Sequence, residues 1–307
     1  MALKDVKSRI ASVKNIQKIT RAMEMVAAAR LRRAEQRIEA LRPYAGAIRR
    51  MTRQAAEAAG NVPNLPILNQ HESEDKIAIL LVTGDRGLAG AFNSQIVRAG
   101  LRAGVDYEGG GKSTVWYASG RRGVSSLAFR GRDAVGAYTG FTDRPSYANA
   151  REIAADLMAA YIDGEVDRVE IVYNRYVSPL TQEVTREVLL PLQEATIMGD
   201  DGAVDSLGER ASDGEHSDHE HTALVEYEPD PDAILERLIP AYVEISIYRA
   251  LLESTASEHG ARMTAMRNAS ENAGDIIKDL TLEFNRERQA AITQEIMEVV
   301  AGAESLV

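Results

Sequence analysis

The chain has 307 residues, no cysteine and a formal net charge of -10. Its length is sufficient for one large domain or for two units. The lack of cysteine excludes disulfides, thiolate catalysis and cysteine metal sites, and the net negative charge argues against general nucleic-acid binding. No stretch approaches 18 consecutive apolar residues, so direct membrane insertion of a helix is not expected.

Charge is distributed unevenly along the chain. Residues 4–53 are strongly basic, whereas residues 200–232 are strongly acidic. The basic segment could meet an acidic partner protein, an anionic membrane or RNA, or it could present a solvated helix face. It lacks the apolar core of a signal peptide, and its helical pattern begins within the first few residues, which favours a bacterial chain or a processed form.

Residues 1–60 are predicted to form an N-terminal coiled-coil helix. Apolar residues recur there in steps of three and four, which is helical spacing. The stripe consists of Leu3, Val6, Ile10, Val13, Ile16, Thr20, Met23, Ala27, Leu31, Ala34, Ile38 and Leu41. Pro43 removes a backbone donor, so a kink or a restart is expected there before further helix over residues 44–59.

Residues 76–195 are predicted to form an α/β domain with a Rossmann-like, mostly parallel sheet. Its first strand, KIAILLV at residues 76–82, is a continuous apolar run, as in strands that are covered on both faces. We expect further strands at 113–118, 133–138 and 168–176, with 181–190 pairing beside the last, and helices at 92–103, 120–129 and 147–161. Helices would then cover both faces of four or five strands.

The loop after the first strand reads TGDRGLAGAFN. Gly84, Gly87 and Gly90 would let the backbone approach a phosphate at a helix N-terminus. Their spacing matches neither GxGxxG nor GxxxxGK. A tight turn is the alternative interpretation, with Asp85 and Arg86 pairing with each other or contacting another subunit.

Residues 199–228 lose the apolar periodicity and are predicted to form an acidic, flexible surface loop. Within it lie His216, His219 and His221, which could bind a metal or could belong to a solvated loop, because no scaffold fixes their geometry. No Ser-His-Asp set, paired-carboxylate site or HExxH motif is present. We therefore expect no catalytic residue, no cofactor and no metal site.

Residues 232–307 are predicted to form a C-terminal coiled-coil helix, with a short lead-in before Pro240, which opens or kinks it. Its stripe consists of Ile245, Tyr248, Leu252, Ala256, Met263, Met266, Ala273, Ile277, Leu280, Phe284 and Ala291. A repeat of about 3.5 residues favours a supercoil with another helix. Because a folded segment separates them, the two terminal helices are expected to return as an antiparallel pair, a shaft with the α/β domain at one end.

Three blocks of the sequence, in order, resemble the gamma subunit of F-type ATP synthases over nearly the full length. They are RIASVKNIQKITRAMEMVAAARLRRA from Arg9 to Ala34, the loop from Thr83 to Asn93, and ITQEIMEVVAGAESL from Ile292 to Leu306. Ala89 stands where many relatives carry cysteine. The acidic stretch at 199–221 is longer than the family minimum.

This resemblance implies a rotor. In the family, the paired terminal helices form a central stalk inside a ring of alternating alpha and beta subunits, while the α/β domain binds epsilon and rests on the c-subunit ring, which proton flow turns. It implies a non-catalytic subunit of a proton-transporting complex, with no nucleic-acid partner. The expected location is peripheral, at the cytoplasmic face of a bacterial plasma membrane.

The resemblance also implies which residues contact beta. They are Met23, Arg288, Gln289, Thr293, Glu295 and Glu298. The first matches a position that faces a lever segment of beta, which is acidic in the family. The next two match positions that grip a loop of beta.

Two functions from other classes remain open on the residues alone. A nucleotide-dependent enzyme with a helical dimerisation arm would use Gly84, Gly87 and Gly90. A passive coiled-coil scaffold would need only the two apolar stripes and would associate as an identical pair.

Overall fold

The computed structural model describes residues 3–59, 65–192 and 231–304. Its elements are α1 (Leu3–Ala59), β1 (Lys76–Val82), α2 (Phe92–Gly109), β2 (Ser113–Ser119), α3 (Arg121–Ala128), β3 (Ala134–Tyr138), α4 (Tyr147–Ile162), β4 (Arg168–Tyr176), β5 (Gln182–Leu190) and α6 (Pro231–Glu304). The acidic stretch expected at 199–228, with its three histidines, lies outside the described residues.

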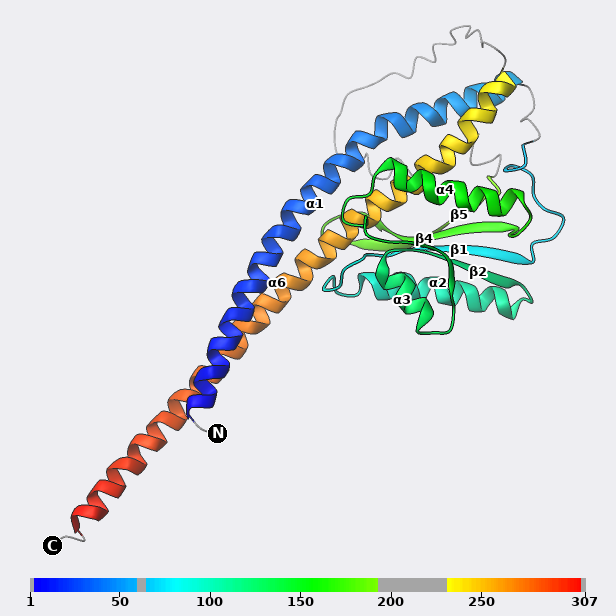
Figure 1. Ribbon diagram of the computed structural model, residues 1–307. Coiled ribbons are helices and arrows are strands. Elements are labelled where there is room, and N and C mark those ends of the chain that lie inside the picture. The colour runs from blue at the N-terminus through cyan, green and yellow to red at the C-terminus, as the bar shows by residue number, and fades with distance from the viewer. Residues whose placement is uncertain (1–2, 60–64, 193–230, 305–307) are drawn as a thin grey trace. The chain divides into compact units, whose positions relative to one another are not determined.

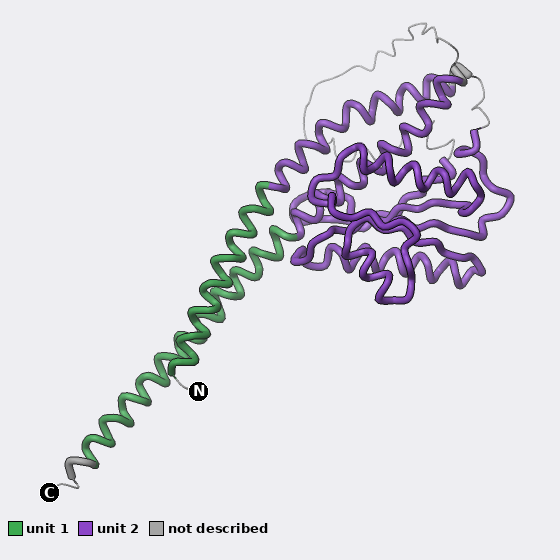
Figure 2. The backbone as a smooth tube through the Cα atoms, viewed as in Figure 1, with its two compact units in different colours: residues 1–29, 262–307 green, residues 30–261 purple. Residues whose placement is uncertain are grey.

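The chain divides into two compact units. One unit consists of residues 1–29 and 262–307, and the other consists of residues 30–261, as Figure 2 shows in green and purple. We refer to them as the coil unit and the sheet unit. Helices α1 and α6 each contribute to both units.

A five-stranded sheet in the order β3-β2-β1-β4-β5 forms the middle of the sheet unit (Figure 1). β1 is parallel to β2 and β4, and β2 is parallel to β3, whereas β5 runs antiparallel to β4. The prediction of a mostly parallel, Rossmann-like sheet is therefore confirmed. The antiparallel strand lies at an edge, as is common in sheets of this kind.

The alternation of side chains along β1 creates two cores, one on each face of the sheet. Ile77, Ile79 and Leu81 pack with buried residues of α2 and α3. Ala78 and Leu80 point the other way and pack with α4, α6 and the last turns of α1. A continuous apolar strand is therefore required, because neither face of β1 meets water.

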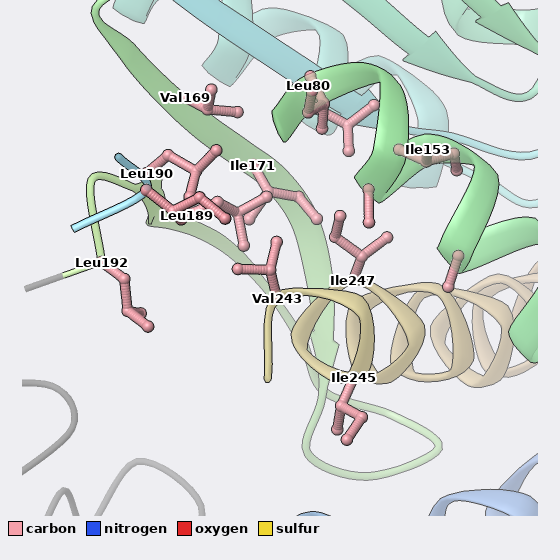
Figure 3. Close-up of a cluster of buried hydrophobic side chains, with 14 of the residues drawn as sticks. Leu80, Ile153, Val169, Ile171, Leu189, Leu190, Leu192, Val243, Ile245 and Ile247 are labelled. Atoms are coloured by element: carbon pink, nitrogen blue, oxygen red, sulfur yellow. The ribbon is translucent and has the colours of Figure 1, made fainter. Parts of the chain in front are cut away.

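The larger core lies between the sheet and helices α4 and α6. Figure 3 shows Leu80 and Ile171 of the sheet, Ile153 of α4 and Ile247 of α6 within one cluster. All four side chains have no exposed surface. Burial of each contributes about 1.5–3 kcal/mol relative to exposure, so this core holds α6 against the sheet.

In the coil unit, α1 and α6 run antiparallel. The Gln17 side-chain amide donates to the Ser270 carbonyl at 3.3 Å, and Glu24 pairs with Arg267 at 3.0 Å, so later residues of α1 meet earlier residues of α6. The predicted antiparallel pair of terminal helices is therefore confirmed.

Two members of the predicted stripes are exposed, Ile16 of α1 and Ala291 of α6. Ile16 is 52% exposed, whereas the neighbouring Gln17 turns inward and its amide lies 3.1 Å from where a Cβ on Gly274 would be. Successive helix positions are about 100° apart, so the inward place at this turn goes to the next residue. A polar side chain fits there because it can reach a backbone carbonyl of α6.

Neither proline ends its helix. α1 continues through Pro43 and α6 continues through Pro240, so a restart at Pro43 is wrong, and the expected lead-in over residues 232–239 is part of α6. Pro43 and Glu39, whose carbonyl loses its donor, are exposed, and water can take the donor's place. α6 itself begins at Pro231, where a missing amide hydrogen costs little.

Candidate functional site

The six predicted contact positions all lie in the coil unit. Met23 is half-buried in α1, within one residue of the Glu24–Arg267 pair. The other five are exposed near the end of α6, where every described residue from 288 to 301 is exposed. Figure 2 shows this part of α6 continuing beyond the start of α1. The structure thus places five of the six on one exposed helical segment.

This exposed segment of α6 is also apolar. Its large apolar side chains are between 48% and 72% exposed, and they are Ile292, Ile296, Met297, Val299 and Val300. A contiguous apolar surface of this kind marks a contact site for another protein. These five residues were not among the predicted contact positions, although their chemistry and density in the last 16 residues could have identified them.

The polar residues on the segment are committed to few contacts within the chain. The Thr293 hydroxyl donates to the Gln289 carbonyl at 2.9 Å, and Gln294 donates to Glu298 at 3.0 Å. Both are local bonds between neighbouring turns of the same helix. The segment can therefore offer charge, hydrogen bonds and apolar area together to a surrounding surface.

The carboxyl ends of the parallel strands are the usual ligand-binding edge of such a sheet. Here that edge is occupied by α6. The Ser254 hydroxyl donates to the Val82 carbonyl at 3.2 Å, and the Ser257 hydroxyl donates to the Asn174 carbonyl at 3.0 Å. All residues from 251 to 260 are buried. The polar face of α6 therefore satisfies the strand ends that a ligand would otherwise contact.

The space left at this edge is too small for a nucleotide. A Cβ on Gly84 would lie 2.6 Å from a carboxylate oxygen of Glu258, so α6 directly touches the glycine of the predicted phosphate loop. The cavity between this loop and α6 is about 10 Å³, which is room for about one water. The geometry disfavours a nucleotide-dependent enzyme that uses this loop.

Asp85 connects three loops at the same edge. Its carboxylate accepts hydrogen bonds from the amides of Arg121, at 3.0 Å, and Gly140, at 2.9 Å. It also accepts bonds from the amide and hydroxyl of Thr142, at 3.3 and 3.0 Å. The loops after β1, β2 and β3 are thus tied together by one side chain, which the sequence did not identify as structural.

The rest of this loop is a tight turn. Leu88 and Gly90 have φ of 61° and 54°, and the Asn93 side chain accepts from the Gly84 amide at 2.8 Å. The pair between Asp85 and Arg86, one of the two alternatives for these residues, does not form. Arg86 lies 3.4 Å from Asp143 instead.

Glu253 is a buried carboxylate of α6. Among the described residues, Glu253 has one oxygen with no hydrogen-bond partner and the other 4.0 Å from Arg249. Burial raises the pKa of Glu253 to about 7, against the charge of Arg249 and with a further rise from Glu187. Arg249 itself donates to Glu187 at 2.7 Å, so its charge is shared between two carboxylates.

The described residues contain no group of three or more histidine, aspartate or glutamate side chains that could hold a metal ion. They also contain no helix that is both long enough and apolar enough to cross a membrane.

The sequence matches the family model described as ATP synthase over residues 2–306. It is 42% identical over 305 residues to the ATP synthase gamma chain of Rubrobacter xylanophilus, covering 99% of this chain and 98% of that one. It is 41% identical over 310 residues to the gamma chain of Streptomyces coelicolor, covering 99% and 96%.

Solved structures show the same likeness. The central stalk and c-ring structure of the Tetrahymena thermophila mitochondrial ATP synthase contains a chain with a TM-score of 0.58 and 25% identity, covering 82% of this chain and 99% of that one. A chain of the Euglena gracilis mitochondrial ATP synthase matches in fold, with a TM-score of 0.66 at 17% identity, covering 99% and 94%. From the full-length family match and these relatives, the chain belongs to the family of ATP synthase gamma chains.

Proposed function

We propose that the chain is the central rotor of a proton-transporting F-type ATP synthase and carries no catalytic site of its own. The observation that carries this proposal is the end of α6, where 14 consecutive residues, 288–301, are exposed although many are apolar. An unpaired apolar helix needs a protein surface around it. A ring of alpha and beta subunits would supply that surface.

The physical task of such a rotor is to make identical catalytic sites differ. Three equivalent beta subunits can adopt different states only if something breaks their symmetry, and an asymmetric pair of helices does so by contacting each one differently. Rotation then reassigns the affinities. Each contact contributes only the difference between its free energies in two beta states, and many small differences add up to coupling.

Within this proposal, the exposed polar residues of α6 are the contacts with beta. Arg288 and Gln289 would grip a loop of beta, with Thr293, Glu295 and Glu298 in the same zone. Met23 would face the acidic lever segment of beta. The half-buried position of Met23 and the exposure of the other five support these roles.

The non-catalytic role is supported by the sheet unit. The edge at which a Rossmann-like sheet would hold a nucleotide is filled by Ser254, Ser257 and Glu258 of α6. We propose that the sheet unit binds epsilon and the c-subunit ring instead. The chain would then be held peripherally at the cytoplasmic face of a bacterial plasma membrane.

A rotation assay tests the proposal. The chain has no cysteine, so a Ser125→Cys variant, at an exposed position of α3, carries a single attachment point for a bead. With the alpha–beta ring fixed to a surface, ATP should drive rotation of the bead in one direction. A bead that stays still while ATP is hydrolysed would refute the rotor role, and the chain without the new cysteine controls for non-specific attachment.

The contact positions have a separate test. Replacing both Arg288 and Gln289 by alanine should lower the ATP-driven proton pumping of membrane vesicles relative to their ATP hydrolysis. Arg286→Ala is the matched control, because Arg286 is also exposed on α6 and lies outside the predicted set. Equal coupling in the two variants would remove the assigned contacts without affecting the rotor proposal.

A further inference from the structure

One cavity in the sheet unit is lined by four arginines, none of which is among the predicted contact positions. Its volume is about 210 Å³. This is below the range of about 300–1,000 Å³ of sites for drug-sized ligands, and well above the space that one water needs. The cavity therefore suits a small ligand with a few waters.

The arginines converge from two elements. Arg30, Arg33 and Arg37 follow each other along α1 in steps of three and four, which places them on one face of the helix. Arg144 comes from the loop between β3 and α4. Leu252 of α6 adds an apolar wall. Three separate parts of the chain thus build one basic cavity.

One carboxylate lies in the cavity, and it is already paired. Asp143 accepts a hydrogen bond from Arg30 at 2.6 Å and lies 3.4 Å from Arg86. Partial burial alone would raise the pKa of Asp143. The hydrogen bond from Arg30 and the charges of Arg30 and Arg86 outweigh burial and lower this pKa, and His259 lowers it further by a smaller amount. Asp143 therefore stays charged and neutralises one of the arginines that touch it.

The other three arginines are not neutralised. Among residues 3–59, 65–192 and 231–304, no carboxylate forms an ion pair with Arg33, Arg37 or Arg144. Counting the four arginines and Asp143, the side chains lining the cavity carry a formal charge of +3. Arg33 and Arg37 are also four residues apart on one helix, where like charges repel. An anion in the cavity would remove this repulsion.

We propose that this cavity is a binding site for a small tetrahedral oxyanion of the phosphate class. Guanidinium groups present planar forks of donors that match the oxygens of phosphate, and charge-assisted bonds of this kind are the strong ones. A phosphate dianion offers enough acceptor oxygens to bond three guanidinium groups at once, whereas a carboxylate has two oxygens. None of the residues that line the cavity is among the six predicted contacts with beta.

Titration of the full-length chain with inorganic phosphate at constant ionic strength tests the proposal. Calorimetry should show saturable binding of one phosphate per chain, weakened about tenfold for each guanidinium removed. Arg33→Gln with Arg37→Gln removes two of them. Arg32→Gln with Arg42→Gln is the matched control, because both arginines are exposed on α1, outside the cavity, and the charge change is the same.

Each outcome decides the proposal. Binding that is lost in the first double variant and kept in the control supports it. Equal binding of phosphate by both variants would overturn it, and so would acetate binding as tightly as phosphate. A chain that binds no phosphate would also overturn it, even if the same chain binds an acidic peptide. If the double variant on α1 fails to fold, Arg144→Gln replaces it, because this residue lies in a loop and its substitution leaves the helix unchanged. Arg144→Gln should also weaken phosphate binding.

Discussion

Replacing Asp85 by alanine should destabilise the sheet unit without affecting any ligand. The carboxylate accepts four hydrogen bonds, which join the loops after β1, β2 and β3. A bond to a charged acceptor contributes about 1.5–3 kcal/mol net. The side chain is half-exposed, so water can take over part of this once it is removed. Counting about half of the lower value for each bond, we expect a loss of about 3 kcal/mol.

The assay uses the chain's own probe. Trp116 is the single tryptophan of the sequence, and it lies buried in β2, 5.2 Å from the Arg132 guanidinium. Its fluorescence therefore reports the unfolding of the sheet unit in urea, and the shift of the midpoint gives the change in free energy. Asp133→Ala is the control, because Asp133 is exposed and its loss changes the net charge equally.

The control should stay within about 0.5 kcal/mol of the unchanged chain. If Asp85→Ala stays within the same range, the loops are held by other contacts and the structural role of Asp85 is refuted. If it is as stable as the control yet loses binding of a nucleotide, Asp85 is a ligand residue instead.

Three further predictions concern other parts of the chain. Glu253 has a folded-state pKa of about 7, above its ordinary 4.5, so the free energy of unfolding should fall as pH rises from about 4.5 through 7, by up to about 3 kcal/mol. Glu253→Gln should abolish this fall. Parallel pH profiles of stability for the variant and the unchanged chain would contradict the prediction. Gly100→Ala should cost about 1–3 kcal/mol because its Cβ would lie 2.3 Å from Leu81, whereas Gly109→Ala on the same helix meets nothing within 4 Å and should be neutral or slightly stabilising; equal stability of the two would disprove the overpacking. Met23→Lys should permit assembly but lower the ratio of protons pumped to ATP hydrolysed in membrane vesicles, because an added cation would hold one beta state too tightly; an unchanged ratio would contradict this.

The elements of the fold were predictable because their signals are local. The apolar run at Lys76–Val82, the turn residues around it and the three- and four-residue stripes of α1 and α6 each follow from the period of the backbone. The outcome at Pro43 was left open between a kink and a restart, because a proline removes one helical hydrogen bond without deciding whether the helix continues. Pro43 and Glu39 are both exposed residues, and α1 continues through them.

The site was only partly predictable, because burial depends on which elements meet. The stretch LLESTASEHG, residues 251–260, carries two glutamates and a histidine, and a sequence pattern cannot show that all ten residues are buried. Their partners, such as the carbonyls of Val82 and Asn174, are 172 and 83 residues away from the serines that bind them. The contact residues near the end of α6 were predicted from a resemblance, not from a pattern.

The buried first part of α6 and its exposed last turns have complementary roles. A helix that must transmit torque has to be fixed at one end and free to be gripped at the other. Ser254, Thr255 and Ser257 fix it, because their buried hydroxyls donate to backbone carbonyls of the sheet unit. Beyond this anchor the helix continues unbroken to Glu304, with its last turns exposed. Occupation of the ligand-binding edge by α6 is therefore what turns a sheet of nucleotide-binding type into a mount for a shaft: the same hydroxyls that exclude a nucleotide hold the helix in place.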